Sequence, residues 1–187
     1  MKISARIPSV IAALFLANTA WAQQSSNPVG WQFGMGYASG GDDLAEIIFT
    51  NGESQSLTAG SGFAIYAGLF NVFDNQPLAL QATIGYLVDD TAASDTNARM
   101  SRYPLDVILF YRNGRHRFGG GVTYHMSPTL DLDNLGGKID FDNATGYLLE
   151  YGYSMFSVRY TDIDYSVSGF SGSVDGSSIG LHLTFNF

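Results

Sequence analysis

Apolar and polar residues alternate with a period of two along most of the chain after residue 28. Between Val29 and Tyr37 the odd positions are Val, Trp, Phe, Met and Tyr, and the even positions are Gly or Gln in all cases. Such alternation predicts β-strands with one apolar face, not helices. The same pattern predicts eight strands in all, at 29–37, 63–70, 78–88, 103–111, 118–126, 145–153, 156–161 and 178–187.

The alternation alone fits both a soluble β-sandwich and a barrel in a membrane, because each has one apolar face per strand. The residues opposite the apolar face favour the barrel. They are mostly Gly, Ala, Ser, Thr and Gln with few charges, which suits the narrow interior of a small closed barrel. Aromatic residues recur near both ends of the apolar faces, as they do where lipid meets headgroup. One belt is Trp31, Tyr111, Phe118, Tyr153, Phe156 and Phe187, and the other is Tyr37, Tyr86, Tyr103, Tyr124 and Tyr160.

The connections between the predicted strands alternate in length. Short turns are expected at 71–77, 112–116 and 154–155, and long polar loops at 38–60, 89–98, 128–143 and 162–176. In outer-membrane barrels the short turns are periplasmic and the long loops extracellular. Of the 17 acidic residues, 14 fall in the four long loops. Asn113-Gly114 in the second turn is typical of a type I′ hairpin.

The beginning of the chain predicts secretion. Lys2 and Arg6 precede an apolar stretch at 10–17 and the small-residue sequence Ala20-Trp21-Ala22, which is typical of a signal peptide over residues 1–22. A membrane-spanning helix is the alternative, but it needs about 20 apolar residues and this run is shorter. Residues 23–187 are then one domain, and the absence of cysteine excludes disulfides and thiolate metal sites.

The last strand carries the clearest family signal. Its alternation through Leu183, Phe185 and Phe187 resembles the C-terminal recognition signal of bacterial outer-membrane proteins, and residues 27–187 resemble the small eight-stranded barrels such as the OmpA membrane domain, OmpX and OmpW. The resemblance implies an all-β fold, a transmembrane eight-stranded antiparallel up-and-down β-barrel in the bacterial cell outer membrane. It also implies contacts with outer-membrane lipids and lipopolysaccharide, insertion by the barrel assembly machinery, and a monomer.

Several inward positions carry charge. If Ser154-Met155 is a two-residue turn, Glu150 lies directly opposite Arg159, and both face the lumen. Asp106 is a candidate third member of this group. The same counting around Asn113-Gly114 places Arg102 opposite His125, unless Pro104 marks a bulge that changes the register. Because eight strands enclose little more than side chains, we expect these charges to form a structural plug, with a narrow gated path or a small apolar ligand site as alternatives.

One short motif suggests catalysis. His125-Met126-Ser127 resembles the His-x-Ser element of outer-membrane lipid A 3-O-deacylases, in which a Glu completes a hydrolytic triad, and Glu150 is the only strand carboxylate that follows. The strand pattern turns His125 and Ser127 inward, away from lipid, and places Glu150 near the opposite end of the barrel. A proton relay needs hydrogen-bond reach, so we expect no catalytic residues.

The remaining chemistry is limited. The pairs Asp131/Asp133 and Asp140/Asp142, across Gly136-Gly137, could bind calcium, but their spacing does not match an EF-hand, so we expect no metal and no cofactor. A pI near 4.5 argues against nucleic acid. We therefore expect a structural, surface-exposed or permeability-accessory role without catalysis. A deacylase-like barrel enzyme and a conduit for a small hydrophobic compound are the alternatives.

Overall fold

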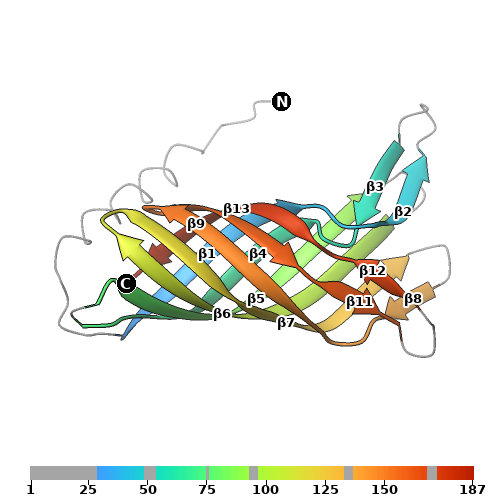
Figure 1. The fold of residues 1–187 in the computed structure, drawn as a ribbon. Helices are drawn as coiled ribbons and strands as arrows, with labels where there is room; N and C mark the ends of the chain where they lie inside the picture. The colour runs from blue at the N-terminus through green and yellow to red at the C-terminus, as the bar shows by residue number, and fades with distance from the viewer. Residues whose placement is uncertain (1–28, 49–53, 75, 93–96, 133–136, 168–171) are drawn as a thin grey trace, which may run out of the picture.

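Eight antiparallel strands form a closed barrel in the computed structural model, which describes residues 29–48, 54–74, 76–92, 97–132, 137–167 and 172–187 (Figure 1). The strand order is β6-β5-β4-β1-β13-β10-β9-β7, and pairing between β6 and β7 closes the ring. The predicted fold class is therefore confirmed. The barrel strands are β1 (Val29–Ser39), β4 (Gly62–Val72), β5 (Leu78–Ala92), β6 (Asn97–Asn113), β7 (His116–Leu132), β9 (Ala144–Tyr153), β10 (Phe156–Asp162) and β13 (Ser178–Asn186).

Five shorter strands extend one end of the barrel, which we call the loop end (Figure 1). β2 pairs with β3, β11 pairs with β12, and β8 adds to β7. The opposite end, the turn end, carries the connections at 73–77, 114–115 and 154–155 together with the C-terminus. Much of what the sequence predicts as long loops is thus β-structure. The five strands are β2 (Asp43–Ile48), β3 (Ser54–Thr58), β8 (Gly137–Asp140), β11 (Asp164–Ser166) and β12 (Ser173–Asp175).

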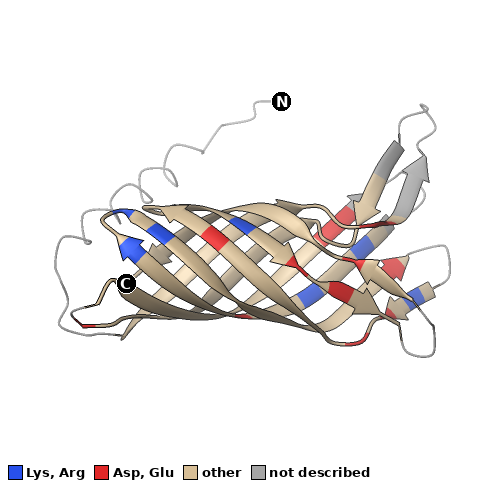
Figure 2. Cartoon of the chain, in the orientation of Figure 1, with Lys and Arg blue, Asp and Glu red and all other residues tan. Residues whose placement is uncertain are grey.

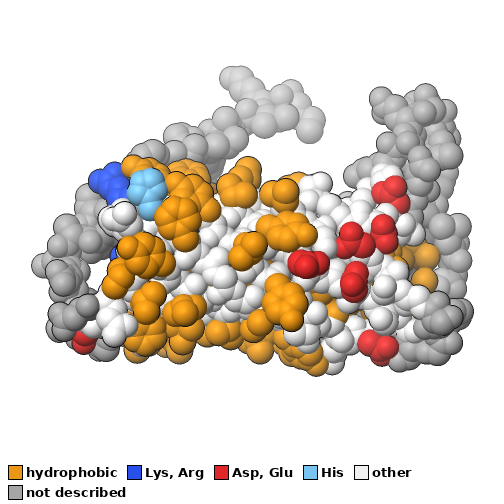
Figure 3. Space-filling model, in the orientation of Figure 1, with side chains coloured by type: hydrophobic (Ala, Val, Ile, Leu, Met, Phe, Trp, Pro, Cys, Tyr) orange, Lys and Arg blue, Asp and Glu red, His pale blue; other side chains and the backbone are white. Residues whose placement is uncertain are grey.

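The outward faces of the barrel strands are apolar and exposed, as the alternation predicts. In β9, inward and outward residues alternate between buried and exposed along the whole strand, and outward Leu149 is 63% exposed. Figure 3 shows apolar side chains over the barrel wall on the viewed face. A surface this apolar is compatible with lipid but not with water. No helix among the described residues is long and apolar enough to cross a membrane.

Closure of the ring satisfies the backbone of every barrel strand, which is the condition for crossing a bilayer with strands. Both predicted aromatic belts lie on the outer surface: Trp31 at the turn end is 71% exposed and Tyr37 toward the loop end is 59% exposed. The chain is therefore an integral β-barrel of the outer-membrane type. The predicted signal peptide lies outside the described residues and stays a prediction.

The turn between β6 and β7 differs from the predicted one. Asn113 pairs with His116, so the two turn residues are Gly114 and Arg115, not Asn113-Gly114. Gly114 has a φ of 60°, and Arg115 is not among the residues with positive φ. That combination fits a type II′ turn, with glycine in its first position, and not the predicted type I′ turn.

A bulge changes the register of the same two strands near the loop end. The step from Ser101 to Tyr103 on β6 lies opposite the longer step from Met126 to Thr129 on β7. The extra residue is on β7, where Ser127 has a φ of 48°. A bulge reverses which side chains point inward beyond it. Ser127 is accordingly exposed, and the prediction that it faces the lumen is wrong.

Apolar side chains fill the interior toward both ends of the barrel. Toward the turn end, Phe110 and Ile108 are fully buried, although β6 looks apolar on both faces in the sequence. At the loop end, Tyr165 and Leu57 come from the added hairpins and are also fully buried. The turn-end cluster is Phe70, Ala79, Ile108, Phe110 and Leu148, and the loop-end cluster is Leu57, Ala59, Ala98, Met100, Leu130, Phe141, Ala144, Ile163 and Tyr165.

Candidate functional site

The charged groups of the lumen lie between these two apolar clusters. The turn at Ser154 and Met155 pairs Tyr153 with Phe156, and this register places Glu150 opposite Arg159. The Arg159 guanidinium donates to Glu150 Oε2 from Nε at 2.9 Å and lies 2.8 Å from it through Nη2. Both side chains are buried, so the pair is shielded from water and is stronger than a surface ion pair.

Asp106 and Arg117 extend this pair into a network of four charges. Arg159 Nη1 lies 2.7 Å from Asp106 Oδ2, and Arg117 Nη2 lies 3.1 Å from Glu150 Oε1. Thr123 donates to Asp106 Oδ1 at 2.6 Å. Two arginines thus face two carboxylates, and the central network is electrically neutral. We call these four charged residues the central network.

Arg117 is not among the inward charges that the strand pattern predicts for this group. The signal that could have found it is the register of β7 and β9, in which Arg117 lies opposite Gly152 and Glu150 opposite Gly119. Arg117 and Glu150 are therefore diagonal neighbours on the same face, which is within reach of two long side chains. Gly152 leaves the space that the Arg117 side chain occupies, and Gly119 leaves space for the Phe110 ring.

Neutral residues connect the network to the rest of the barrel wall. Arg117 Nη2 lies 3.4 Å from Thr184 Oγ1, and the Tyr66 hydroxyl lies 2.8 Å from the same oxygen. Arg159 lies over the Tyr66 ring at 5.7 Å, and Arg117 lies over the Phe110 ring at 5.3 Å. The network and its neighbours therefore span the lumen from β4 to β9.

Arg102 and His125 lie nearer the loop end and do not face each other. The turn at Gly114 and Arg115, one residue later than predicted, pairs His125 with Pro104, so the predicted pairing of Arg102 with His125 is wrong. Both side chains instead contact Tyr165, from the β11 hairpin. Arg102 lies over its ring at 5.7 Å, and His125 Nδ1 is hydrogen-bonded to its hydroxyl.

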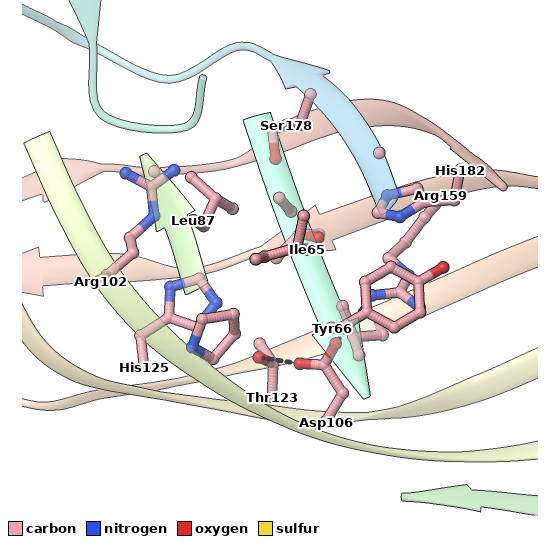
Figure 4. Close-up of a pocket in the computed structure, with 17 residues that line it drawn as sticks. Ile65, Tyr66, Leu87, Arg102, Asp106, Thr123, His125, Arg159, Ser178 and His182 are labelled. Atoms are coloured by element: carbon pink, nitrogen blue, oxygen red, sulfur yellow. Dashed lines mark hydrogen bonds and ion pairs between the residues drawn. The ribbon is translucent and has the colours of Figure 1, made fainter. Parts of the chain in front are cut away.

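A small cavity lies between the Arg102 group and the central network (Figure 4). Its volume is about 40 Å³. Arg102 and His125 lie on one side of it, and Arg159 and His182 on the other. Asp106 also lines the cavity, held there by its hydrogen bond from Thr123.

His125, Ser127 and Glu150 do not form a hydrolytic arrangement. His125 points inward and bonds to Tyr165, whereas Ser127 lies on the exposed side of the bulge. Ser127 accepts from Thr129 and donates its backbone N–H to Asn143. The carboxylate of Glu150 is engaged by two arginines. A serine nucleophile needs a base within hydrogen-bond reach, and these side chains lie on opposite sides of the wall.

The acidic loop end offers no metal cluster among the described residues. Asp140 is instead paired with neighbours on its own hairpin, at 3.2 Å from Lys138 Nζ and 3.0 Å from Thr129 Oγ1. The hydrogen bonds from Lys138 and Thr129 hold the pKa of Asp140 below its ordinary value. Asp133, the partner in one of the predicted calcium pairs, lies outside the described residues.

The residues of the predicted assembly signal lie along β13 and just after it. The Phe187 side chain is 73% exposed, and its backbone exchanges two hydrogen bonds with Trp31, at 2.8 and 3.1 Å. Leu183 is half-buried. Phe185 pairs with outward Phe33 but is only 8% exposed, which departs from the predicted exposure of this face.

Solved structures similar to this chain include the following two. One is Ail, the attachment invasion locus protein of Yersinia pestis, in complex with the heparin analogue sucrose octasulfate, with a TM-score of 0.46 and 11% identity over 85% of this chain and 97% of that chain. The other is Neisserial surface protein A, with a TM-score of 0.46 and 12% identity over 84% of this chain and 97% of that chain. No protein-family model and no curated protein sequence matches the chain.

Proposed function

We propose that this protein is a non-conducting and non-catalytic barrel that displays an acidic, hydrogen-bonded set of strands at the outer surface of the cell. This set, which we call the collar, consists of β2, β3, β8, β11 and β12 and their connections among the described residues. The central network carries the proposal. Four charged side chains cross the lumen at hydrogen-bond distance, and apolar clusters lie on either side of them. An eight-stranded barrel has room for little else, so this arrangement supports a plug and not a pore.

The loop end supports surface display because its strands are tied to one another. Asp42 N–H donates to the backbone oxygen of Asp175 at 2.7 Å, and Asp175 N–H donates in return to Asp42 Oδ2 at 2.9 Å, which links the β2 and β12 regions. Asp142 N–H donates to Ser166 O at 2.8 Å, which links the β8–β9 connection to β11. Figure 2 shows that acidic residues gather at this end. The collar therefore presents a negative surface on a firm support.

Orientation can be tested at a single side chain. Lys138 is the only lysine after residue 22, it lies on β8 at the loop end, and its side chain is 59% exposed. A membrane-impermeant amine reagent applied to intact cells should label it. Lys138→Arg is the matched control, because it removes the reactive amine and keeps the charge opposite Asp140. Labelling of wild type only after cell lysis would place the loop end in the periplasm and overturn surface display.

Conductance measurements test the proposal that the barrel does not conduct, and lipid A analysis tests the proposal that it is not an enzyme. Purified wild-type protein in planar bilayers should give no stable conductance steps. The Glu150→Ala/Arg159→Ala variant is the positive control, because it removes two side chains of the central network and shows whether the assay detects an opened lumen. Stable steps from wild type would refute the plug. Lipid A from cells with and without the gene should have the same mass profile. A change in acyl chains that Ser127→Ala abolishes would establish a deacylase.

A further inference from the structure

One of the three buried arginines of the lumen makes no ion pair with a carboxylate among the described residues. Asp106 and Glu150 are engaged by Arg159 and Arg117. Arg102 is a third buried arginine, only 1% exposed, and among the described residues it has no carboxylate within ion-pair distance. Asp89, half-buried on β5, attracts it from beyond that distance. Asp89 pairs with buried Met100 and so shares the inward face with Arg102, but the Arg102 guanidinium has no counter-charge in contact with it among the described residues.

The guanidinium of Arg102 also has donors to spare. Its Nη2 donates to the backbone oxygen of Ser61 at 3.0 Å. Its Nε and Nη1 are buried and have no acceptor in the described part of the chain. A buried charge without a counter-charge and buried donors without acceptors are both costly to a folded protein. Both costs fall on the same side chain.

The cavity described above lies next to this side chain. Arg102 lines it on one side, and His182, whose Nδ1 is also buried without a partner, lines it on the other (Figure 4). The hydroxyl-bearing residues Ser178 and Thr161 complete its polar wall. Asp106 would repel an anion, but its oxygens already accept from Arg159 and Thr123. The free donors of the cavity wall therefore outnumber its free acceptors.

We propose that this cavity binds one small monovalent anion, of about the size of chloride, against the Arg102 guanidinium. The volume of about 40 Å³ sets the size limit. A water molecule needs at least about 10–15 Å³ on this measure, so the cavity holds a halide with one or two waters but not an organic acid of several carbons. The anion gives the Arg102 guanidinium a counter-charge in contact and accepts from Nε and Nη1, and it stabilises the closed barrel.

The test is thermal unfolding of the refolded barrel in detergent micelles at constant ionic strength, with sodium chloride replacing sodium gluconate. Chloride should raise the unfolding midpoint in a saturable manner, by roughly 5 °C at a concentration 100-fold above its Kd. Arg102→Met should abolish the response. Arg99→Met is the matched control, since Arg99 lies on the same strand but is exposed and paired with Asp90, and it should keep the full response.

Three outcomes would overturn the proposal: a wild-type midpoint that is independent of chloride, an Arg102→Met variant that responds like wild type, or equal loss of the response in both variants. If Arg102→Met does not fold, wild-type crystals grown in bromide decide instead. An anomalous peak in contact with the Arg102 guanidinium supports the site. A well-ordered Arg102 without such a peak refutes it.

Discussion

Replacing Glu150 by glutamine removes the one carboxylate that two buried arginines share. Arg159 keeps a partner, because Asp106 lies 2.7 Å from its Nη1. Arg117 does not, since Glu150 is the only carboxylate within ion-pair distance of it among the described residues, and its side chain is only 8% exposed. The change therefore leaves one buried positive charge uncompensated.

The magnitude follows from that count of charges. Removing one member of a buried pair costs about 3–5 kcal/mol. Glutamine keeps one oxygen that can accept from Arg159 or Arg117, so we expect Glu150→Gln to lower the free energy of unfolding by about 3 kcal/mol, the lower end of that range. Arg117→Met alone should cost less, because Glu150 then keeps both of its contacts with Arg159.

Two double variants make the prediction specific to this geometry. Glu150→Gln with Arg117→Met leaves the Asp106–Arg159 pair intact and restores neutrality, so it should recover about 1–2 kcal/mol of the loss. Glu150→Gln with Arg159→Met is equally neutral but separates the two remaining charges, Arg117 and Asp106, from their partners. It should therefore be less stable than the first double variant.

The measurement is reversible urea unfolding in lipid vesicles, followed by tryptophan fluorescence. Trp31 is the only tryptophan after residue 22, and it lies on the outer face at the turn end, where it reports transfer from lipid to water. A Glu150→Gln variant within 1 kcal/mol of wild type would refute the reasoning that the network is dry. So would a reversed order of the two double variants, which would mean that Arg159 and not Arg117 is the arginine left uncompensated.

Three further predictions concern the barrel wall and use matched variants. Leu149→Arg, on the lipid face in the middle of β9, should cost about 2–4 kcal/mol, whereas Leu80→Arg, close to the turn end of β5, should cost about 0–1 kcal/mol; equal costs in vesicle unfolding would contradict the membrane position. Gly121→Ala would place a Cβ into the carbonyl oxygen of Val107 and should cost about 1–3 kcal/mol, but Gly120→Ala, with its nearest atom 3.8 Å away, should be tolerated. Phe187→Ala removes the side chain of the predicted assembly signal, so it should lower the assembled fraction in cells. Refolding in detergent should stay near wild type, because both backbone bonds to Trp31 remain. Equal losses in both settings would mean that Phe187 contributes through packing alone.

The alternation was sufficient to predict the eight strands and their lipid-facing sides, because side-chain direction along a strand depends only on the parity of neighbouring residues. The Ser154-Met155 turn was likewise enough to place Glu150 opposite Arg159, since a two-residue turn determines the pairing of the residues that flank it. Closure into a barrel was predicted because the residues opposite the apolar face are mostly small and uncharged, which suits a narrow lumen better than a face exposed to water.

Other features depended on distant parts of the chain. The β6–β7 turn is at Gly114-Arg115 and not at Asn113-Gly114, and this shift of one residue moved Arg102 away from His125. The residues around the turn are compatible with both positions. Whether Pro104 or Ser127 carried the bulge depended on how β6 and β7 fit against their neighbours. The alternation could not predict which way Ile108 and Phe110 point, because β6 is apolar on both faces. In the structure both point into the lumen, where they pack in the apolar cluster toward the turn end.

The sequence by itself thus determined that this chain forms strands, which face of most strands meets lipid, and that opposite charges share the interior. Only the tertiary structure decided which charges meet. Arg117 joined Glu150 through a diagonal contact across β7 and β9, for which Gly152, opposite Arg117, left room. Arg102 has no carboxylate in contact among the described residues, and its neighbours are the Tyr165 ring from the β11 hairpin and the Ser61 carbonyl. Which side chains meet across the lumen depends on the register of every strand pair around the closed barrel, and no single segment of the sequence determines all of these registers.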